Sequence, residues 1–209
     1  MKKSYVLLLA PVLLLQISFA QSDAGAKKIL DAVSAKVKAS KGVTGNFALK
    51  SITSKGKPNG TKTGNICIKG EKYILKQGKT EVICDGAKTY SYDGNKTITV
   101  TSTEEASETL SPQKLLSGSY DKEYGYKLVG SKGNSYEIEM KPNDSRKSFQ
   151  KVSLFVDKSK NMITKAVIFD KGDNTLELSI SNMNTNATLQ DNLFIFNKAK
   201  YPPDTEILD

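Results

Sequence analysis

The sequence predicts a mainly β domain in which short strands form an antiparallel meander and helices cover one side. Between residues 47 and 100 apolar side chains recur at every second position, which is the period of a half-buried strand. Short polar turns, most of them with glycine, separate these runs. Such turns join sequential antiparallel strands, whereas a parallel sheet needs long crossover connections.

The N-terminus has the pattern of a secretory signal peptide. Two lysines precede an apolar run over residues 5–17, and small side chains follow at Ser18 and Ala20. The run is shorter than the ~20 residues of a membrane-spanning helix, which disfavours an uncleaved anchor. No cysteine lies near the cleavage point to take a lipid. We therefore expect a cleaved signal peptide over 1–20 and a single exported domain over 21–209.

The charge is basic but dispersed. The formal net charge is +9, and the loss of the two signal-peptide lysines leaves +7. A basic surface attracts anionic membranes and acidic partners. However, the lysines are scattered and Arg146 is the only arginine, so no nucleic-acid partner is expected.

The side chains that usually carry catalysis are few. The chain has no histidine, which removes the commonest general base and metal ligand. Two cysteines without histidine cannot form a structural zinc site, and no phosphate-binding loop motif occurs. We therefore expect no enzyme, no catalytic residue, no metal site and no cofactor.

Residues 23–40 predict one amphipathic helix that ends before Gly42. Its apolar side chains, which include Leu30, Val33 and Val37, recur three and four positions apart with lysines between them. A lid on the domain's own sheet is the expected role of this stripe.

The strand register of the first half follows from the lengths of its hairpin loops. Loops at 69–72, 78–79, 85–87 and 93–95 all have common hairpin lengths. They place Tyr73 opposite Cys84, Leu75 opposite Val82, Val82 opposite Tyr90, Tyr90 opposite Ile98, and Tyr92 opposite Lys96. One face then carries Ile66, Ile68, Tyr73, Leu75, Val82, Cys84, Tyr90, Tyr92, Ile98 and Val100.

This register also predicts that both thiols are free. Cys84 lies on the apolar face, whereas Cys67 lies on the polar face, and one strand separates them. Second-neighbour strands are ~10 Å apart. That distance exceeds the ~7 Å limit between the Cα atoms of a disulfide.

The second half begins with a polar segment over 102–111 and a short helix with Pro112 near its start. Further strands are expected at about 124–130, 134–141, 149–157, 161–170 and 175–184, before a final apolar segment at 193–196.

Four segments in this order resemble the LolA family of periplasmic outer-membrane lipoprotein carrier proteins. They are 64–69, 84–92, 111–116 and 191–196, and the resemblance covers essentially the whole mature chain. The most specific motif is the Asp-Gly turn in 84–92, which an aromatic residue and a tyrosine follow. Two features depart from the family: tryptophan is absent, and residues 69–71 lack the usual arginine and proline that are described as a latch to the lid helices.

The resemblance implies an incomplete, strongly curved antiparallel β-barrel of about 11 strands. An N-terminal helix and short central lid helices would close it around an apolar cavity. In that cavity a monomeric periplasmic carrier shields the acyl chains of lipoproteins between the inner and outer membranes. The implied partners are an inner-membrane ABC-transporter complex that releases the lipoprotein and, where the organism has one, an outer-membrane acceptor.

On this interpretation helix and sheet residues line the acyl-chain cavity: Leu30, Val33, Val37, Phe47, Leu49, Ile66, Ile68, Tyr73, Leu75, Tyr90, Tyr92, Ile98, Val100, Val152, Leu154, Val156, Leu176, Leu178 and Ile180. The lid residues are Leu110, Leu115 and Leu116. Two alternatives stay open: the same side chains form an ordinary packed core, or the chain is a periplasmic lipid-binding or regulatory module of this fold that senses lipoproteins or binds a membrane partner.

Overall fold

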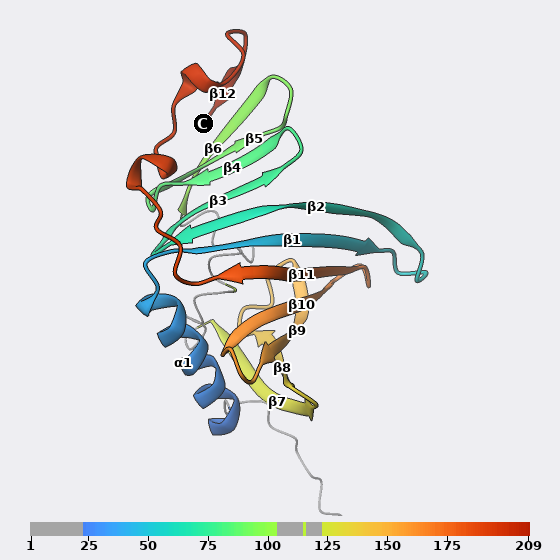
Figure 1. Ribbon diagram of the computed structural model, residues 1–209. Coiled ribbons are helices and arrows are strands. Elements are labelled where there is room, and N and C mark those ends of the chain that lie inside the picture. Colours follow the sequence, from blue (N-terminus) through green and yellow to red (C-terminus); the bar gives the residue numbers. More distant parts are fainter. Residues whose placement is uncertain (1–22, 104–114, 116–122) are drawn as a thin grey trace, which may run out of the picture.

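A computed structural model describes residues 23–103, 115 and 123–209, and these residues contain a long N-terminal helix, two short 3-10 helices and one large sheet (Figure 1). The elements are α1 (Ala24–Ala39), β1 (Val43–Ile52), β2 (Pro58–Lys69), β3 (Lys72–Gln77), β4 (Thr80–Cys84), β5 (Lys88–Tyr92), β6 (Thr97–Ser102), β7 (Tyr124–Lys132), β8 (Ser135–Pro142), β9 (Phe149–Asp157), β10 (Met162–Asp170), β11 (Thr175–Asn184), the 3-10 helices η1 (Asp191–Phe194) and η2 (Lys198–Lys200), and β12 (Glu206–Leu208).

The sheet has 12 strands in the order β12-β6-β5-β4-β3-β2-β1-β11-β10-β9-β8-β7. Neighbouring strands are antiparallel, except that β12 pairs in parallel with β6. The prediction of a mainly β fold with an N-terminal helix is confirmed. The extra strand is β12, which is too short to show a period in the sequence. Within the described ranges the order ends at β7 and β12 without a pairing that closes it. The predicted central lid helices lie outside those ranges except for residue 115.

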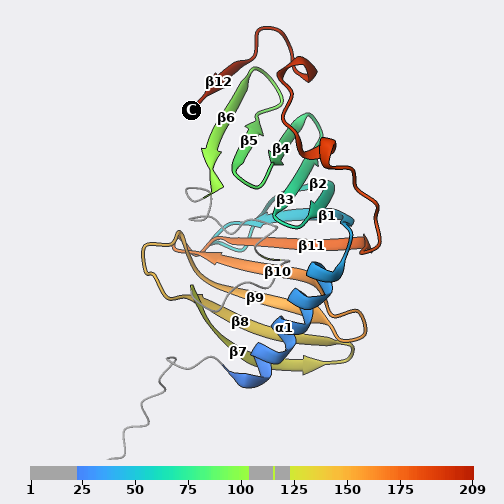
Figure 2. The same cartoon turned by 90° about the vertical axis from the view of Figure 1, so that its left-hand side faces the viewer.

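The predicted helix over 23–40 is α1, with caps at both ends. The Asp23 carboxylate accepts hydrogen bonds from the Gly25 and Ala26 amides at 2.7 and 3.4 Å. Ser40 follows the last turn in an extended conformation and ends the helix. The buried stripe of α1 packs against the sheet at β7 and β10 (Figure 2), as the apolar spacing predicts.

One face of the sheet, here called the core face, carries the main apolar cluster. Its register can be followed from strand to strand: Leu49 opposes Leu178, Leu178 opposes Ala166, and Ala166 opposes Leu154. Leu154 in turn opposes Ile138 of β8. Because every residue of this row points to the same face, the row continues one apolar surface under α1.

The opposite face, here called the outer face, is covered over β3–β5 by the segment that follows β11. Phe194 is fully buried there and forms a second cluster with Ile74 and Ile83. Lys69 and Lys72 also hold the segment, because both form ion pairs with the Asp191 carboxylate, at 3.3 and 3.1 Å. The final apolar segment of the sequence is therefore a 3-10 turn that packs on the sheet.

The predicted register is correct from β2 to β4 but wrong from β4 to β5. Tyr73 opposes Cys84 and Leu75 opposes Val82, as predicted. Val82, however, opposes Ser91, and Tyr90 opposes Ile83. The connection after Cys84 has four residues, 85–88, in place of the predicted three. A shift of one residue moves every following side chain of the strand to the other face.

The Asp85 side chain explains the longer loop. Its carboxylate accepts hydrogen bonds from the Ala87 and Lys88 amides, both at 2.8 Å, and the Asp85 amide donates to the Lys88 carbonyl at 3.1 Å. Gly86 supplies the positive φ of 102° that the turn requires. These bonds hold Lys88 within the turn, so strand pairing with β4 begins at Thr89.

The next hairpin is also longer than predicted. Asp93 caps it through hydrogen bonds from the amides of residues 95–97. Tyr90 consequently opposes Val100, and Tyr92 opposes Ile98, where the prediction had Ile98 and Lys96. The pairing of β5 with β6 is thus shifted by two residues. Because this is an even number, Tyr90, Tyr92, Ile98 and Val100 still lie on the same face of the sheet.

Candidate functional site

The candidate site is the core face, and fifteen of the nineteen predicted cavity residues come from α1 or from this face of the sheet. The other four, Tyr90, Tyr92, Ile98 and Val100, lie on the outer face because of the Asp85 turn. Their assignment to the cavity wall is therefore wrong. Of the predicted lid residues, Leu115 is buried in the main cluster, and Leu110 and Leu116 lie outside the described residues.

Part of the core face is packed. Seven of the fifteen predicted cavity residues on α1 and the core face are at most 2% exposed, namely Leu30, Val33, Ile66, Ile68, Val152, Leu154 and Val156. Between 6% and 9% exposed are Val37, Phe47, Tyr73, Leu178 and Ile180. The packed-core alternative therefore holds for the area in which α1 meets the sheet.

A second part of the core face is open. Leu49, Leu75 and Leu176 are only half-buried, and so are Val82 and Ile168 of the same face. Ile168 was not among the predicted site residues, although it alternates with Ala166 in an apolar strand. The part of these apolar side chains that is still exposed would be removed from water by an apolar ligand, which favours binding.

A cavity of about 650 Å³ lies at the end of this open part. Its apolar lining contains Phe149, Ile168 and Leu176, together with Ile52 at the end of β1. Phe149 belongs to the main apolar cluster, so the cavity leads from the core to the surface. Its volume lies within the range of about 300–1,000 Å³ that is usual for small-molecule sites.

The rim of the cavity is polar and comes from turns. Asn174 and Ser148 contribute to it, as does the Asp170 carboxylate, which accepts hydrogen bonds from the Gly172 and Asn174 amides at 2.7 and 2.8 Å. The Asn174 side chain and these amides lower the pKa of Asp170. The ionised Asp170 carboxylate therefore stabilises its own turn. This structural role explains why it lies at the rim.

Polar groups on the core face itself are few. Burial raises the pKa of Tyr73, so its hydroxyl stays protonated at neutral pH. Cys84 is buried nearby, with its sulfur 3.7 Å from the Glu71 carbonyl oxygen. Both cysteines are free, as predicted from their places on opposite faces. In the described part of the chain, no three His, Cys, Asp or Glu side chains gather as a metal site.

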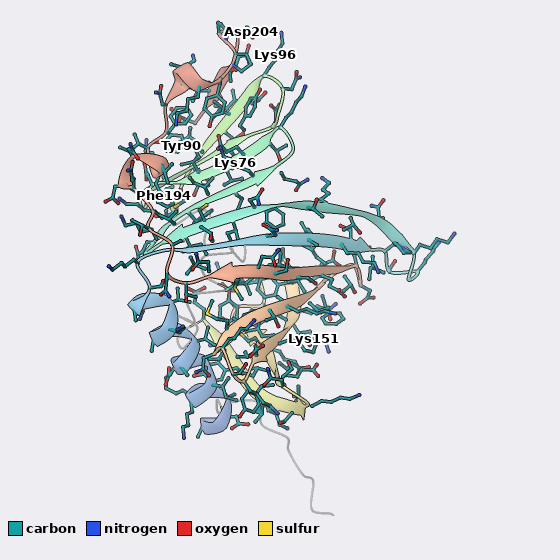
Figure 3. The ribbon with its side chains drawn as sticks, in the orientation of Figure 1. Lys76, Tyr90, Lys96, Lys151, Phe194 and Asp204 are labelled. Atoms are coloured by element: carbon teal, nitrogen blue, oxygen red, sulfur yellow. The ribbon has the colours of Figure 1, made fainter. Side chains whose placement is uncertain are left out.

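The displaced tyrosines take part in holding the C-terminal segment. Tyr90 stacks on Phe196 with ring centroids 4.4 Å apart, and Tyr92 meets the edge of Tyr201 at 4.9 Å. Figure 3 places Tyr90 and Phe194 where this segment passes the strands. The Tyr201 hydroxyl donates to Glu81 at 2.7 Å, and burial together with this bond raises the pKa of Tyr201.

One feature of the sequence indicates that the outer face is covered. Cys67, Ile74 and Ile83 interrupt an otherwise polar row, and all three belong to the cluster around Phe194. Apolar residues on the supposedly exposed face mark a surface that something else must cover.

The chain matches the family model of the outer membrane lipoprotein carrier protein LolA over residues 38–197. No curated protein matches it. Among solved structures, an uncharacterized conserved protein from Thermus thermophilus is 11% identical with a TM-score of 0.58, and the match covers 88% of this chain and 98% of that chain. This similarity shows a shared fold.

Two further structures are similar at lower scores. A LolA superfamily protein from Nitrosomonas europaea is 15% identical with a TM-score of 0.49, over 82% of this chain and 97% of that chain. The MucA/MucB complex of Pseudomonas aeruginosa contains a chain that is 13% identical with a TM-score of 0.49, over 83% of this chain and 62% of that chain. Among the described helical residues, no helix is long and apolar enough to cross a membrane.

Proposed function

The chain belongs to the LolA family, and from this premise we propose that it is a periplasmic carrier that shields the acyl chains of lipoproteins and moves them from the inner to the outer membrane. The observation that carries the proposal is the open part of the core face. There, half-buried apolar side chains lead to a cavity of about 650 Å³ with Phe149, Ile168 and Leu176 in its wall.

The physical need for such a surface follows from the cargo. Each CH₂ group kept from water is worth ~0.8 kcal/mol, so a long acyl chain does not leave a membrane for water unshielded. A carrier must cover the chain and later release it. A surface that is half-buried, beside a packed core that keeps its shape, supports both requirements.

The proposed binding mode places the acyl chains along the core face from β4 to β10. Leu75 and Val82 oppose each other on β3 and β4, and Ile168 opposes Leu176 on β10 and β11. The polar rim of the cavity then faces the peptide part of the lipoprotein. The proposed partners are an inner-membrane ABC-transporter complex as donor and an outer-membrane acceptor. No catalytic step is required of the chain.

A release assay tests this function. Spheroplasts that make radiolabelled lipoproteins are incubated with the exported protein, and the soluble fraction is analysed. We expect soluble lipoprotein in complex with the added chain. If the chain instead binds the spheroplast membrane and releases no lipoprotein, the carrier function is contradicted and the alternative of a regulatory module is favoured.

Two variants sharpen the assay. Ile168→Asp places a charge in the cavity wall, and we expect release to fall at least about tenfold because a carboxylate in an apolar site costs several times RT. Val129→Asp is the matched control, since Val129 is 48% exposed on β7. Thermal unfolding of both variants separates loss of binding from loss of folding. Equal release by the two variants contradicts the assignment of the cavity.

A further inference from the structure

The hairpin of β1 and β2 extends beyond β3, and its tip extends beyond β11 as well (Figure 1). Residues 50–62 of this hairpin are here called the basic arm. It carries Lys50, Lys55, Lys57 and Lys62. The sequence has no carboxylate anywhere between Asp31 and Glu71, so no acidic residue of the arm offsets this charge.

The lysines of the basic arm are available to a partner. Lys55, Lys57 and Lys62 are exposed and Lys50 is half-buried. Within the described ranges none of the four makes an ion pair, whereas Lys69, Lys72 and other lysines of the sheet do. Like charges gathered on a projecting element repel one another, and an anionic partner relieves that repulsion.

The arm also stands at the opening of the cavity. Ser51, Thr53 and Asn59 belong to both the arm and the cavity lining. The Ser54 amide donates to the Asn174 side chain at 3.1 Å, which joins the arm to the turn between β10 and β11. Lys62 opposes Leu49 and therefore lies on the core face, whereas Lys50 opposes Thr61 on the outer face. Positive charge thus lies on both sides of the arm next to the opening of the cavity. On the outer face, Glu177 of β11 opposes Lys50.

The acidic residues of the neighbouring turn do not cancel this charge. Asp170 is held by amides of its own turn, and Asp173 is within 3.4 Å of Gln150. Lys171 of the same turn donates to the Ser145 carbonyl at 2.6 Å. The turn contributes two carboxylates and one lysine, against four lysines of the arm.

We propose that the basic arm is a docking element for a membrane surface rich in anionic phospholipids. The lysines bind the phosphate-bearing headgroups, and the opening of the cavity is thereby turned toward the lipid. A cavity with an apolar wall and a polar rim that opens beside phosphate-binding cations matches the layered chemistry of a bilayer, in which acyl chains lie directly under the headgroups. This inference goes beyond the carrier function, because it concerns lipid surfaces and needs no lipoprotein.

A simpler explanation exists for part of the charge. Residues 58–63 of β2 pair only with β1, and lysine and proline on such a free edge discourage pairing between molecules. That explanation accounts for Lys62 and Pro58. It does not account for Lys55 and Lys57, which lie in the turn at the tip of the arm.

Vesicle sedimentation tests the proposal. The exported protein is mixed at low salt with vesicles of phosphatidylglycerol and phosphatidylethanolamine, or with phosphatidylcholine alone. We expect binding to the anionic vesicles only, and weaker binding as salt is raised. The double variant Lys55→Gln/Lys57→Gln should bind about thirty-fold more weakly, from the typical effect of two lysines at an anionic surface.

The matched control removes the same charge at other turns. Lys132→Gln/Lys160→Gln changes two exposed lysines next to the turns of β7–β8 and β9–β10, and binding should stay within about twofold of wild type. Equal losses in the two double variants would mean that net charge alone acts, and would overturn the proposal. The proposal is also overturned if the wild-type protein does not bind anionic vesicles, even if the arm is then found to bind an acidic protein.

Discussion

The Asp23 carboxylate joins the start of α1 to strand β7. One oxygen accepts from the Gly25 amide at 2.7 Å, and the other accepts from the Leu128 amide at 3.2 Å. These two hydrogen bonds, with the bond from Ala26 and the charge of Lys127, lower the pKa of Asp23. The side chain therefore caps the helix and also fixes its first turn against the sheet.

This pKa shift predicts a pH dependence of stability. Because the pKa of Asp23 is lower in the folded than in the unfolded chain, its contribution is present above about pH 4 and is lost as the pH falls through the folded value. Asp23→Ala should lower the melting temperature at pH 7 and have a smaller effect at about pH 2 to 3. Thermal unfolding of both proteins across this range measures the difference. If Asp23→Ala lowers the melting temperature by the same amount at every pH, the ionised carboxylate does not have this role.

A single side chain, that of Asp85, also decides which residues the core face contains. Three-residue and four-residue hairpin loops are both common, and the sequence Asp-Gly fits either. The two amide bonds that Asp85 accepts select the four-residue loop, and Tyr90 then moves to the outer face. Local pattern does not resolve this choice, because tyrosine is compatible with an apolar cavity and with a half-exposed aromatic cluster.

At the scale of elements, the sequence predicted α1 and strands β7–β11 to within two residues at nearly every end. The spacing of apolar residues and the positions of turn residues in the sequence are sufficient to place these ends. The pairing of β1 with β11 was not predicted, since more than a hundred residues separate them and local pattern carries no information on such contacts. The cavity depends on this pairing, because it brings Ser51 and Ile52 beside Leu176.

The C-terminal segment is an element in its own right, and it is held mainly by Phe194 and its neighbours. The Phe194 side chain is 0% exposed, whereas Ile195 beside it is 60% exposed. The Lys96–Asp204 ion pair, at 2.6 Å, joins its distal part to the β5–β6 hairpin (Figure 3). The segment covers apolar strands that water would otherwise reach.

This packing predicts unequal effects of two adjacent substitutions. Phe194→Ala should lower the free energy of unfolding by about 3 kcal/mol, which is typical of a buried phenylalanine. Ile195→Ala should change it by less than about 0.5 kcal/mol, because its side chain faces solvent. Urea unfolding of the two variants gives both values. Similar losses at the two positions would show that the segment is not anchored through Phe194.

At the scale of the whole molecule, one sheet performs two tasks on its two faces. The outer face binds the protein's own C-terminal segment over β3–β5. The core face is packed under α1 and open beyond it, where the cavity of about 650 Å³ meets the base of the basic arm. In the proposed carrier function, the packed region would keep the fold intact while cargo binds to the open part and leaves it.

Photocrosslinking tests whether acyl chains bind to the core face. A photoreactive amino acid replaces Leu176 on the core face or Tyr90 on the outer face in cells that incorporate radiolabelled palmitate into lipoproteins. Both positions are half-buried, so the two probes are matched in exposure. The account predicts labelled crosslinks from position 176 and few or none from position 90. Crosslinks that are equal at the two positions, or stronger from position 90, would contradict it.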